Sequence, residues 1–297
     1  MVEEELVTST EEELPMSTEK ELVVSKKIRD LKKGIAVFDN KFINAFYRMT
    51  LTQKRLLNMA VAAVNAKQIL PKGKRVVVSI DDFAQLSGLS TQSAVYRCRE
   101  AAADLISVRV VDIEYVDPNV MLRVNAKSAG HKEVKRISHL NFFQEVEVLD
   151  TESSKVITFM FSDWVIPYIA KLDGNFTKVH LEHVNPLTSF YSMRLYESVV
   201  LQMPDAAGVH CRLMKLSELR DIFGLTDEKY KRWVDFKKRC IVSSVDELHE
   251  KTPFDWRFET IGKGRYLQGV LFSATPCKQK EFIFDGELKL PGIHCDE

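Results

Sequence analysis

Lysine and arginine gather in one segment of the second half of the chain, DEKYKRWVDFKKRCIVSSVDELHEK, residues 227–251. Its apolar positions recur at helical spacing, which predicts a helix with one buried side and one strongly basic side. The basic side comprises Lys229, Lys231, Arg232, Lys237, Lys238 and Arg239. Cations on an exposed helix face can bind phosphates or the O6 and N7 atoms of guanine. These six residues are therefore candidate nucleic-acid contacts, and the alternative interpretation is a solvated charged face.

A second candidate surface lies in the first half, in the segment TQSAVYRCREAAADLIS, residues 91–107. Alanine, valine, cysteine and leucine occupy its inward helical positions. The candidate contacts on the other side are Gln92, Ser93, Arg97 and Arg99. They could read base edges or position the helix, although Glu100 and Asp104 follow and favour the solvated alternative. Further along, glycines in the predicted turn at 262–265 allow positive φ, so Lys263 and Arg265 can lie against phosphate.

Each candidate helix follows a shorter helix and a glycine turn. In the first half we expect a buried helix at 51–66 with Thr52 as a possible cap, a short strand at 76–78 and a helix IDDFAQLS. Ser79 would cap the IDDFAQLS helix, Gly88 would end it, and Ser90 or Thr91 would cap the next helix. Strands at 142–149 and 156–161 then predict a hairpin. Helix, turn, helix and hairpin in this order are typical of a winged-helix domain.

The same pattern occurs twice. A shift of 136 positions places Phe83, Leu86 and Gly88 on Leu219, Ile222 and Gly224, so IDDFAQLSGL reappears as LSELRDIFGL. The second copy has a counterpart of each element: a helix at 189–203, a strand at 213–216, a cap at Thr226 or Asp227, and a hairpin at 255–274. The predicted fold class is α+β, with two tandem winged-helix domains related by an internal pseudo-repeat.

The predicted domain boundaries follow from this repeat and from composition. Residues 1–33 form an acidic, mostly disordered extension, 34–172 the first winged-helix domain, 173–275 the second domain with the main DNA recognition, and 276–297 a tail. Within the first domain, 108–139 is expected to hold a further strand and a loop near 126–131. A helix at 164–172 is expected to close that domain.

Charge and cysteine content exclude several other classes of protein. The 42 basic and 42 acidic residues cancel, but residues 1–25 hold eight glutamates and one lysine, so the remainder carries a surplus of seven positive charges. The chain has no run of 18 apolar residues and an acidic start, which argues against membrane insertion or export and for a cytoplasmic location. The five cysteines are scattered, which argues against a disulfide framework or zinc site. Cys98 and Cys240 fall on apolar helical positions and are expected in the core.

Several short blocks of residues resemble one known family. They are Leu51-Thr52 with Arg55-Leu56-Leu57, Ala94 to Arg97, Glu100-Ala101-Ala102, Pro167-Tyr168, Phe176-Thr177, the run Ser189 to Glu197 that contains Arg194-Leu195-Tyr196-Glu197, Phe236-Lys237, Glu250-Lys251-Thr252, and Gly264-Arg265. In order and spacing, over about residues 35 to 275, this pattern is similar to the initiator replication proteins of iteron-containing, theta-replicating plasmids, the RepE and RepA type. The acidic N-terminal extension and the acidic first wing turn, with Asp150 and Glu152, depart from it.

The resemblance implies a function and a set of partners. It implies that monomers bind direct repeats (iterons) of double-stranded DNA at a plasmid origin, open the adjacent DNA with the host DnaA protein and help to load the replicative helicase. It also implies a homodimer in equilibrium with the monomer, formed mainly through the first domain, that binds an inverted repeat at its own promoter and represses it. Host chaperones are expected partners on the same ground.

Two other functions are considered. A transcriptional repressor could have the same fold and no replicative role, and a DNA-nicking enzyme is a third hypothesis. The pair His180 and His183 lacks the spacing of a nickase or metalloprotease motif, no phosphate-binding loop occurs, and Tyr191 and Tyr196 have a spacing that suits packing. The sequence therefore predicts no enzyme, catalytic residue, metal or cofactor.

Overall fold

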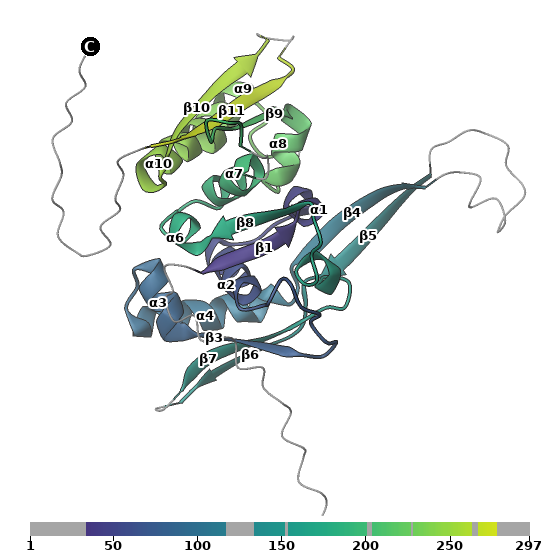
Figure 1. Ribbon diagram of the computed structural model, residues 1–297, viewed down its shortest axis with the longest axis vertical. Coiled ribbons are helices and arrows are strands. Elements are labelled where there is room, and N and C mark those ends of the chain that lie inside the picture. The colour runs from purple at the N-terminus through teal and green to yellow at the C-terminus, as the bar shows by residue number, and fades with distance from the viewer. Residues whose placement is uncertain are drawn as a thin grey trace, which may run out of the picture.

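A computed structural model describes residues 34–116, 134–151, 154–200, 204–226, 228–262 and 267–277 of the 297-residue chain. The predicted N-terminal extension, nearly all of the predicted tail, and the predicted loop at 126–131 lie outside these residues. Figure 1 shows three layers, with one winged-helix domain at the bottom, a second at the top, and a two-stranded sheet across the middle.

The first domain is built from α2 (Leu51–Ala62), β3 (Arg75–Ser79), α3 (Ile80–Ser87), α4 (Thr91–Leu105), β6 (Phe143–Asp150) and β7 (Lys155–Phe161). β7 pairs with both β3 and β6 in antiparallel fashion. The helices begin where the side chains of Ser79 and Ser90 accept hydrogen bonds from the backbone N–H groups of Asp82 and Ser93. Gly88 ends α3 with φ +64, in the left-handed region that glycine adopts freely. The winged-helix prediction is confirmed for this half.

The second domain has the same order of elements: α7 (Phe190–Val200), β9 (His210–Lys215), α8 (Leu216–Ile222), α9 (Trp233–Phe236), η3 (Lys237–Val242, π-helical), α10 (Ser243–Lys251), β10 (Phe254–Ile261) and β11 (Gly269–Pro276). β11 pairs with β9 and β10, as β7 pairs with β3 and β6. Because the pairing order is the same, the predicted internal repeat is confirmed.

Further elements join the two domains. They are β1 (Ile35–Asp39), α1 (Asn40–Asn44), β2 (Phe46–Tyr47), β4 (Arg109–Val116), β5 (Val134–Asn141), η2 (Ile166–Tyr168), β8 (Phe176–His180) and α6 (Leu181–Val184). β1 pairs with β8, while α2 contacts β1 and α7 contacts β8, so this sheet lies between the equivalent helices of the two domains. The predicted boundary at residues 172 and 173 lies just before β8 and stays a prediction.

Three local predictions in the first half differ from the structure. The cap expected at Thr52 is wrong, because Thr50 caps α2 and its side chain accepts a hydrogen bond from the backbone N–H of Gln53. The segment 108–139 holds two strands, β4 and β5, which pair with each other, and β4 also pairs with β2. The helix expected at 164–172 is wrong, because only the single 3-10 turn η2 forms there. Pro167 has no N–H to continue a helical ladder, and Lys171 has φ +52, which an α-helix does not allow.

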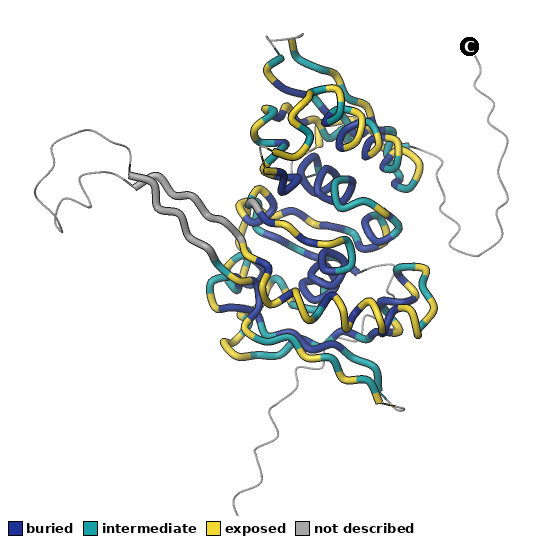
Figure 2. The backbone as a smooth tube through the Cα atoms, turned by 180° about the vertical axis from the view of Figure 1, so that it is seen from behind, coloured by how far each residue is buried: buried dark blue, intermediate teal, exposed yellow. Residues whose placement is uncertain are grey.

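The buried centre of the molecule contains charged residues. Glu197 on α7 accepts hydrogen bonds from Lys54 Nζ on α2 at 2.8 Å, from Arg194 Nη1 at 3.1 Å and from Asn58 Nδ2 at 3.4 Å. Arg194 also donates to the Tyr47 hydroxyl at 2.6 Å and to three backbone carbonyls. The side chains of Lys54, Arg194 and Glu197 are at most 1% exposed. Because Lys54 lies on α2 and Glu197 on α7, this cluster joins the two domains. Figure 2 shows that the middle of the molecule is mostly buried.

Candidate nucleic-acid interface

Helix α4 exposes the side that the sequence predicts. Gln92, Ser93, Arg97 and Arg99 are exposed, whereas Cys98 on the opposite side is fully buried, as expected. The Ser93 hydroxyl accepts a hydrogen bond from the hydroxyl of the capping residue Ser90 at 2.9 Å, so it also belongs to the helix cap. The exposed face thus combines an amide, a hydroxyl and two guanidinium groups, which suits base edges and phosphates.

Arg99 has an acidic partner on the wing. Its Nη2 atom lies 2.6 Å from Oδ2 of Asp150, the last residue of β6, and the Arg99 side chain is 59% exposed. This ion pair ties α4 to the β6–β7 hairpin and offsets the charge that Arg99 offers to DNA. Tyr96, 67% exposed, lines the groove between helix and wing together with Gln92 and Arg99. Tyr96 is not among the contacts that the sequence predicts.

The second basic helix starts later than the sequence predicts. The expected start at Thr226 or Asp227 is wrong, because the helix begins at Trp233 with Arg232 as its N-cap. Tyr230 has φ +54, which interrupts any helix that would begin before it. Lys229 and Lys231 therefore lie on a loop, Arg232 stands at the helix start, and the remaining three candidates lie on the π-helical stretch η3: Lys237, Lys238 and Arg239.

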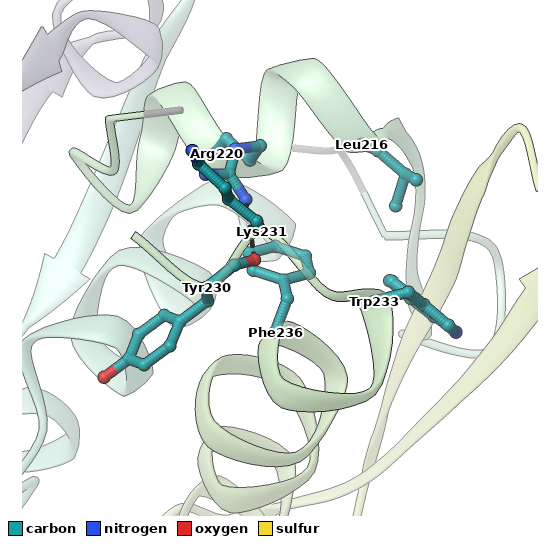
Figure 3. A pocket seen from close by; sticks show the side chains of 6 residues that line it. All are labelled: Leu216, Arg220, Tyr230, Lys231, Trp233 and Phe236. Atoms are coloured by element: carbon teal, nitrogen blue, oxygen red, sulfur yellow. Dashed lines mark hydrogen bonds between the residues drawn. The ribbon is translucent and has the colours of Figure 1, made fainter. Parts of the chain in front are cut away.

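The loop before this helix is held by Arg220 of α8. Its Nη2 atom donates to the carbonyls of Thr226 at 2.6 Å and Lys229 at 2.7 Å, and its Nη1 atom donates to the carbonyl of Tyr230 at 3.3 Å. Figure 3 shows Arg220 above this loop, in a pocket that Trp233 and Phe236 also line. Three carbonyls bound by one guanidinium fix the loop in place, so Arg220 positions the cations at the start of the helix. Sequence reasoning missed this residue, because its carbonyl partners become neighbours only in the folded loop.

The six cations of this region differ in how far they are engaged. A hydrogen bond with the Tyr191 hydroxyl raises the pKa of Lys229, which keeps this lysine charged. Lys231 pairs with Glu228 at 2.6 Å on the exposed surface. Lys237 and Arg239 lie over aromatic rings, 5.5 Å and 5.7 Å from the centroids of Phe258 and Tyr230. Arg232 and Lys238 are exposed, and within the described residues neither forms an ion pair or stacks on a ring. Of the six candidate cations, these two are the least engaged by other described side chains.

The structure also corrects the alignment of the two copies. Gly88 and Gly224 are 136 positions apart, but the buried pair Cys98 and Cys240 is 142 apart, so the second turn is six residues longer. Burial then matches at 143 positions, with Leu105 and Leu248 both fully buried, because the π-helical stretch between them adds one residue. With the shift of 142 positions, which applies at the start of the two helices, Gln92, Tyr96 and Arg97 correspond to Val234, Lys238 and Arg239. The two helices therefore differ at the first two of these three positions.

The second wing is only partly described. β10 and β11 pair along their length, and the side chain of Trp256 on β10 is 3% exposed and belongs to the core. Gly262 has φ +90, as a tight turn after β10 requires. Lys263 and Arg265 lie outside the described residues, so their phosphate contacts stay a prediction.

The histidine pair lies in a packed environment. The rings of His180 and His183 are 5.1 Å apart, and His183 Nδ1 is 2.7 Å from the hydroxyl of the fully buried Tyr196. Burial, together with the neighbouring His180, lowers the pKa of His183 to about 4, so its ring is neutral at pH 7. Among the described residues, no three His, Cys, Asp or Glu side chains are grouped as a metal site would need. In the same part of the chain, no helix is long and apolar enough to span a membrane.

Comparison with known proteins agrees with the paired domains. Residues 35–200 match the family described as "Initiator Replication protein, WH1", and residues 215–274 match "Initiator Rep protein, WH2". The chain belongs to this family of replication initiators. Membership accounts for the two winged-helix domains and for the residue pattern shared with plasmid initiators. The two matched ranges contain the whole of α4 and of α8 to α10.

Two curated proteins of Escherichia coli are similar to this initiator. "PI protein" is 23% identical over 263 residues, covering 83% of this chain and 81% of its own length. "Replication initiation protein" is 25% identical over 166 residues, covering 55% of this chain and 46% of its own length. A solved structure described as "Crystal structure of Pi initiator protein in complex with iteron DNA" has the same fold, with a TM-score of 0.65, 19% identity, and coverage of 84% of this chain and 99% of that chain.

Proposed function

We propose that this initiator binds directly repeated sites, iterons, in a plasmid replication origin as a monomer. The observation that carries the proposal is the paired surface: two winged-helix domains each expose a polar or basic recognition helix whose opposite side is buried in its own core. The likeness of 84% of the chain to an initiator solved with iteron DNA supports the same ligand. Recognition helices of this type enter the major groove and place their N-terminal residues against base edges.

The two domains would read one asymmetric site. Two recognition helices in one chain can occupy successive major grooves about 34 Å apart, a geometry that other proteins obtain by dimerising. Gln92 and Tyr96 on α4 correspond to Val234 and Lys238 in the second domain, so the two half-sites would differ in sequence. An asymmetric site has a direction along the DNA. Its copies all point the same way in a direct repeat and point in opposite ways in an inverted repeat.

The finer steps belong to the same proposal. Bound monomers open the adjacent DNA with the host DnaA protein and help to load the replicative helicase. Dimers, formed mainly through the first domain, bind an inverted repeat at the initiator's own promoter and repress it. Host chaperones are further expected partners. No catalytic step is assigned to the protein itself, and its expected location is the cytoplasm.

DNase footprinting of the purified protein on the DNA flanking its gene, at two salt concentrations, tests this proposal. We expect protection of several evenly spaced direct repeats, which weakens at higher salt because phosphate contacts release counterions. Protection of a single inverted repeat at the promoter alone would favour a transcriptional repressor of the same fold. Strand cleavage of a supercoiled origin would favour a nicking enzyme, and absence of any specific protection would refute the proposal.

A pair of substitutions tests the role of the second helix. Arg232→Ala combined with Lys238→Ala should weaken specific binding by about 1–3 kcal/mol for each base that the variant no longer reads. Fluorescence anisotropy with one labelled repeat measures the change. Lys72→Ala is the matched control, since it removes an exposed cation whose partner is Asp163, outside both helices. An unchanged affinity in the double variant would remove this helix from the reading role.

A further inference from the structure

The recognition helix of the second domain carries an exposed apolar residue. Val234 is 63% exposed, and it is the only exposed apolar side chain among the described residues of 228–251. Its exposed neighbours along the chain are cations, Lys231 and Arg232 before it and Lys238 one helical turn after it. A valine therefore lies among exposed cations at the start of this helix.

Val234 lies at the start of the recognition helix, and its side chain faces outward. It is the second residue of α9, directly after the N-cap Arg232 and the first residue Trp233. It points away from the core side of the helix, where Phe236 and Cys240 are at most 2% exposed. Residues at the start of a recognition helix are the ones that contact base edges in the major groove.

Single exposed apolar residues are common on protein surfaces and usually need no explanation. Two observations argue that Val234 has a role in binding. Valine is β-branched and stabilises the start of an exposed helix less than the lysines and arginines around it. In the corrected alignment, Val234 corresponds to Gln92 of α4, an exposed polar residue at the same place in the other recognition helix. At this position the first domain therefore offers hydrogen-bonding groups and the second domain offers only an apolar surface.

We propose that Val234 reads the C5-methyl group of a thymine, an inference that rests on the proposed binding of origin repeats. Valine has no hydrogen-bond donor or acceptor on its side chain, so it can select a base only by shape and apolar contact. The thymine methyl is the apolar group that base pairs present in the major groove. Arg232 and Lys238 flank Val234 and can bind the neighbouring phosphates or guanines, which would hold the valine methyls against that thymine.

Replacing thymine by uracil removes the methyl group and leaves all hydrogen-bonding atoms in place. The protected repeat is synthesised with uracil at one thymine position at a time, and each duplex is titrated with the wild-type protein and with Val234→Ala. We expect one position in the second domain's half-site at which uracil lowers wild-type affinity about fourfold, the equivalent of about 0.8 kcal/mol for one buried methyl group. Val234→Ala should bind the thymine duplex more weakly and show a thymine-to-uracil ratio near one at that position.

Leu213→Ala is the matched control, because Leu213 is 59% exposed on β9 of the same domain and outside the recognition helix. It should keep the wild-type ratio. If the wild type shows no sensitive thymine, or Val234→Ala keeps the wild-type ratio at every position, the inference is wrong while binding of the repeat still stands. If the wild type does not distinguish the repeat from a scrambled duplex, the proposed function itself fails.

Discussion

Removing the charge of Glu197 tests how the two domains are held together. Glu197 is the one carboxylate in the described part of the buried cluster, and Lys54 and Arg194 are its two cations. Glu197→Gln keeps the shape of the side chain and replaces a carboxylate oxygen by a neutral amide nitrogen. The cluster then changes from one net positive charge to two, in a place where neither cation reaches water.

The expected cost follows from this charge count. Breaking a buried ion pair by neutralising one partner destabilises proteins by about 3–5 kcal/mol, because an uncompensated charge stays buried. Lys54→Met should cost less, because it leaves the neutral pair of Arg194 and Glu197 and no uncompensated charge. It forfeits the ion pair of Lys54 with Glu197 and the contacts of the ammonium group with the rings of Phe38 and Tyr47. The double variant should be more stable than Glu197→Gln alone, because one of the two unpaired cations is gone.

Thermal unfolding followed by circular dichroism measures these differences. At about 2–4 °C per kcal/mol for a chain of this size, Glu197→Gln should lower the melting temperature by on the order of 10 °C. Glu228→Gln is the control, because its ion pair with Lys231 is exposed and should contribute at most about 1 kcal/mol. A loss of less than about 1 kcal/mol in Glu197→Gln, or additive losses in the double variant, would refute the charge argument.

Two further predictions concern the DNA surface and the thiols. Asp150→Asn should release Arg99 to bind phosphate, so non-specific DNA affinity should rise and its salt slope steepen by about one unit, which a salt titration of anisotropy would detect; an unchanged slope would contradict it. Burial raises the pKa values of Cys98 and Cys240 to about 12, so both stay protonated at pH 8. The exposed Cys211 should therefore react with a thiol reagent in the native protein while Cys98 and Cys240 react only after unfolding, and mass spectrometry of the labelled peptides would show whether this order holds.

The fold could be predicted wherever its signals are local. Three of these signals act within a few residues: the capping serines Ser79 and Ser90, the glycine turn at Gly88, and the alternation of the wing strands. The elements that they predict are all present. The repeat added independent support, because the same order of elements returned with the same strand pairing. Local chemistry therefore sufficed for the two winged-helix domains.

The start of the second recognition helix depended on contacts that are not local. All of residues 228–232 except Tyr230 are acidic or basic and tolerate a helix, so periodicity extended the helix through them. The structure instead binds this stretch as a loop through Arg220, with Tyr230 at φ +54. A pattern along the chain cannot show that one guanidinium will bind three carbonyls of a loop six residues longer than its counterpart.

The residues that carried the family resemblance and those that would read DNA lie in different places. Arg194, Tyr196 and Glu197 belong to the strongest block of the resemblance, yet all three are buried between the domains, where they stabilise the fold. Val234 and Lys238 are exposed, and their replacement leaves the core packing untouched. Two initiators can therefore share the buried cluster and bind different repeats, because substitutions on the exposed face change the site without a cost in stability.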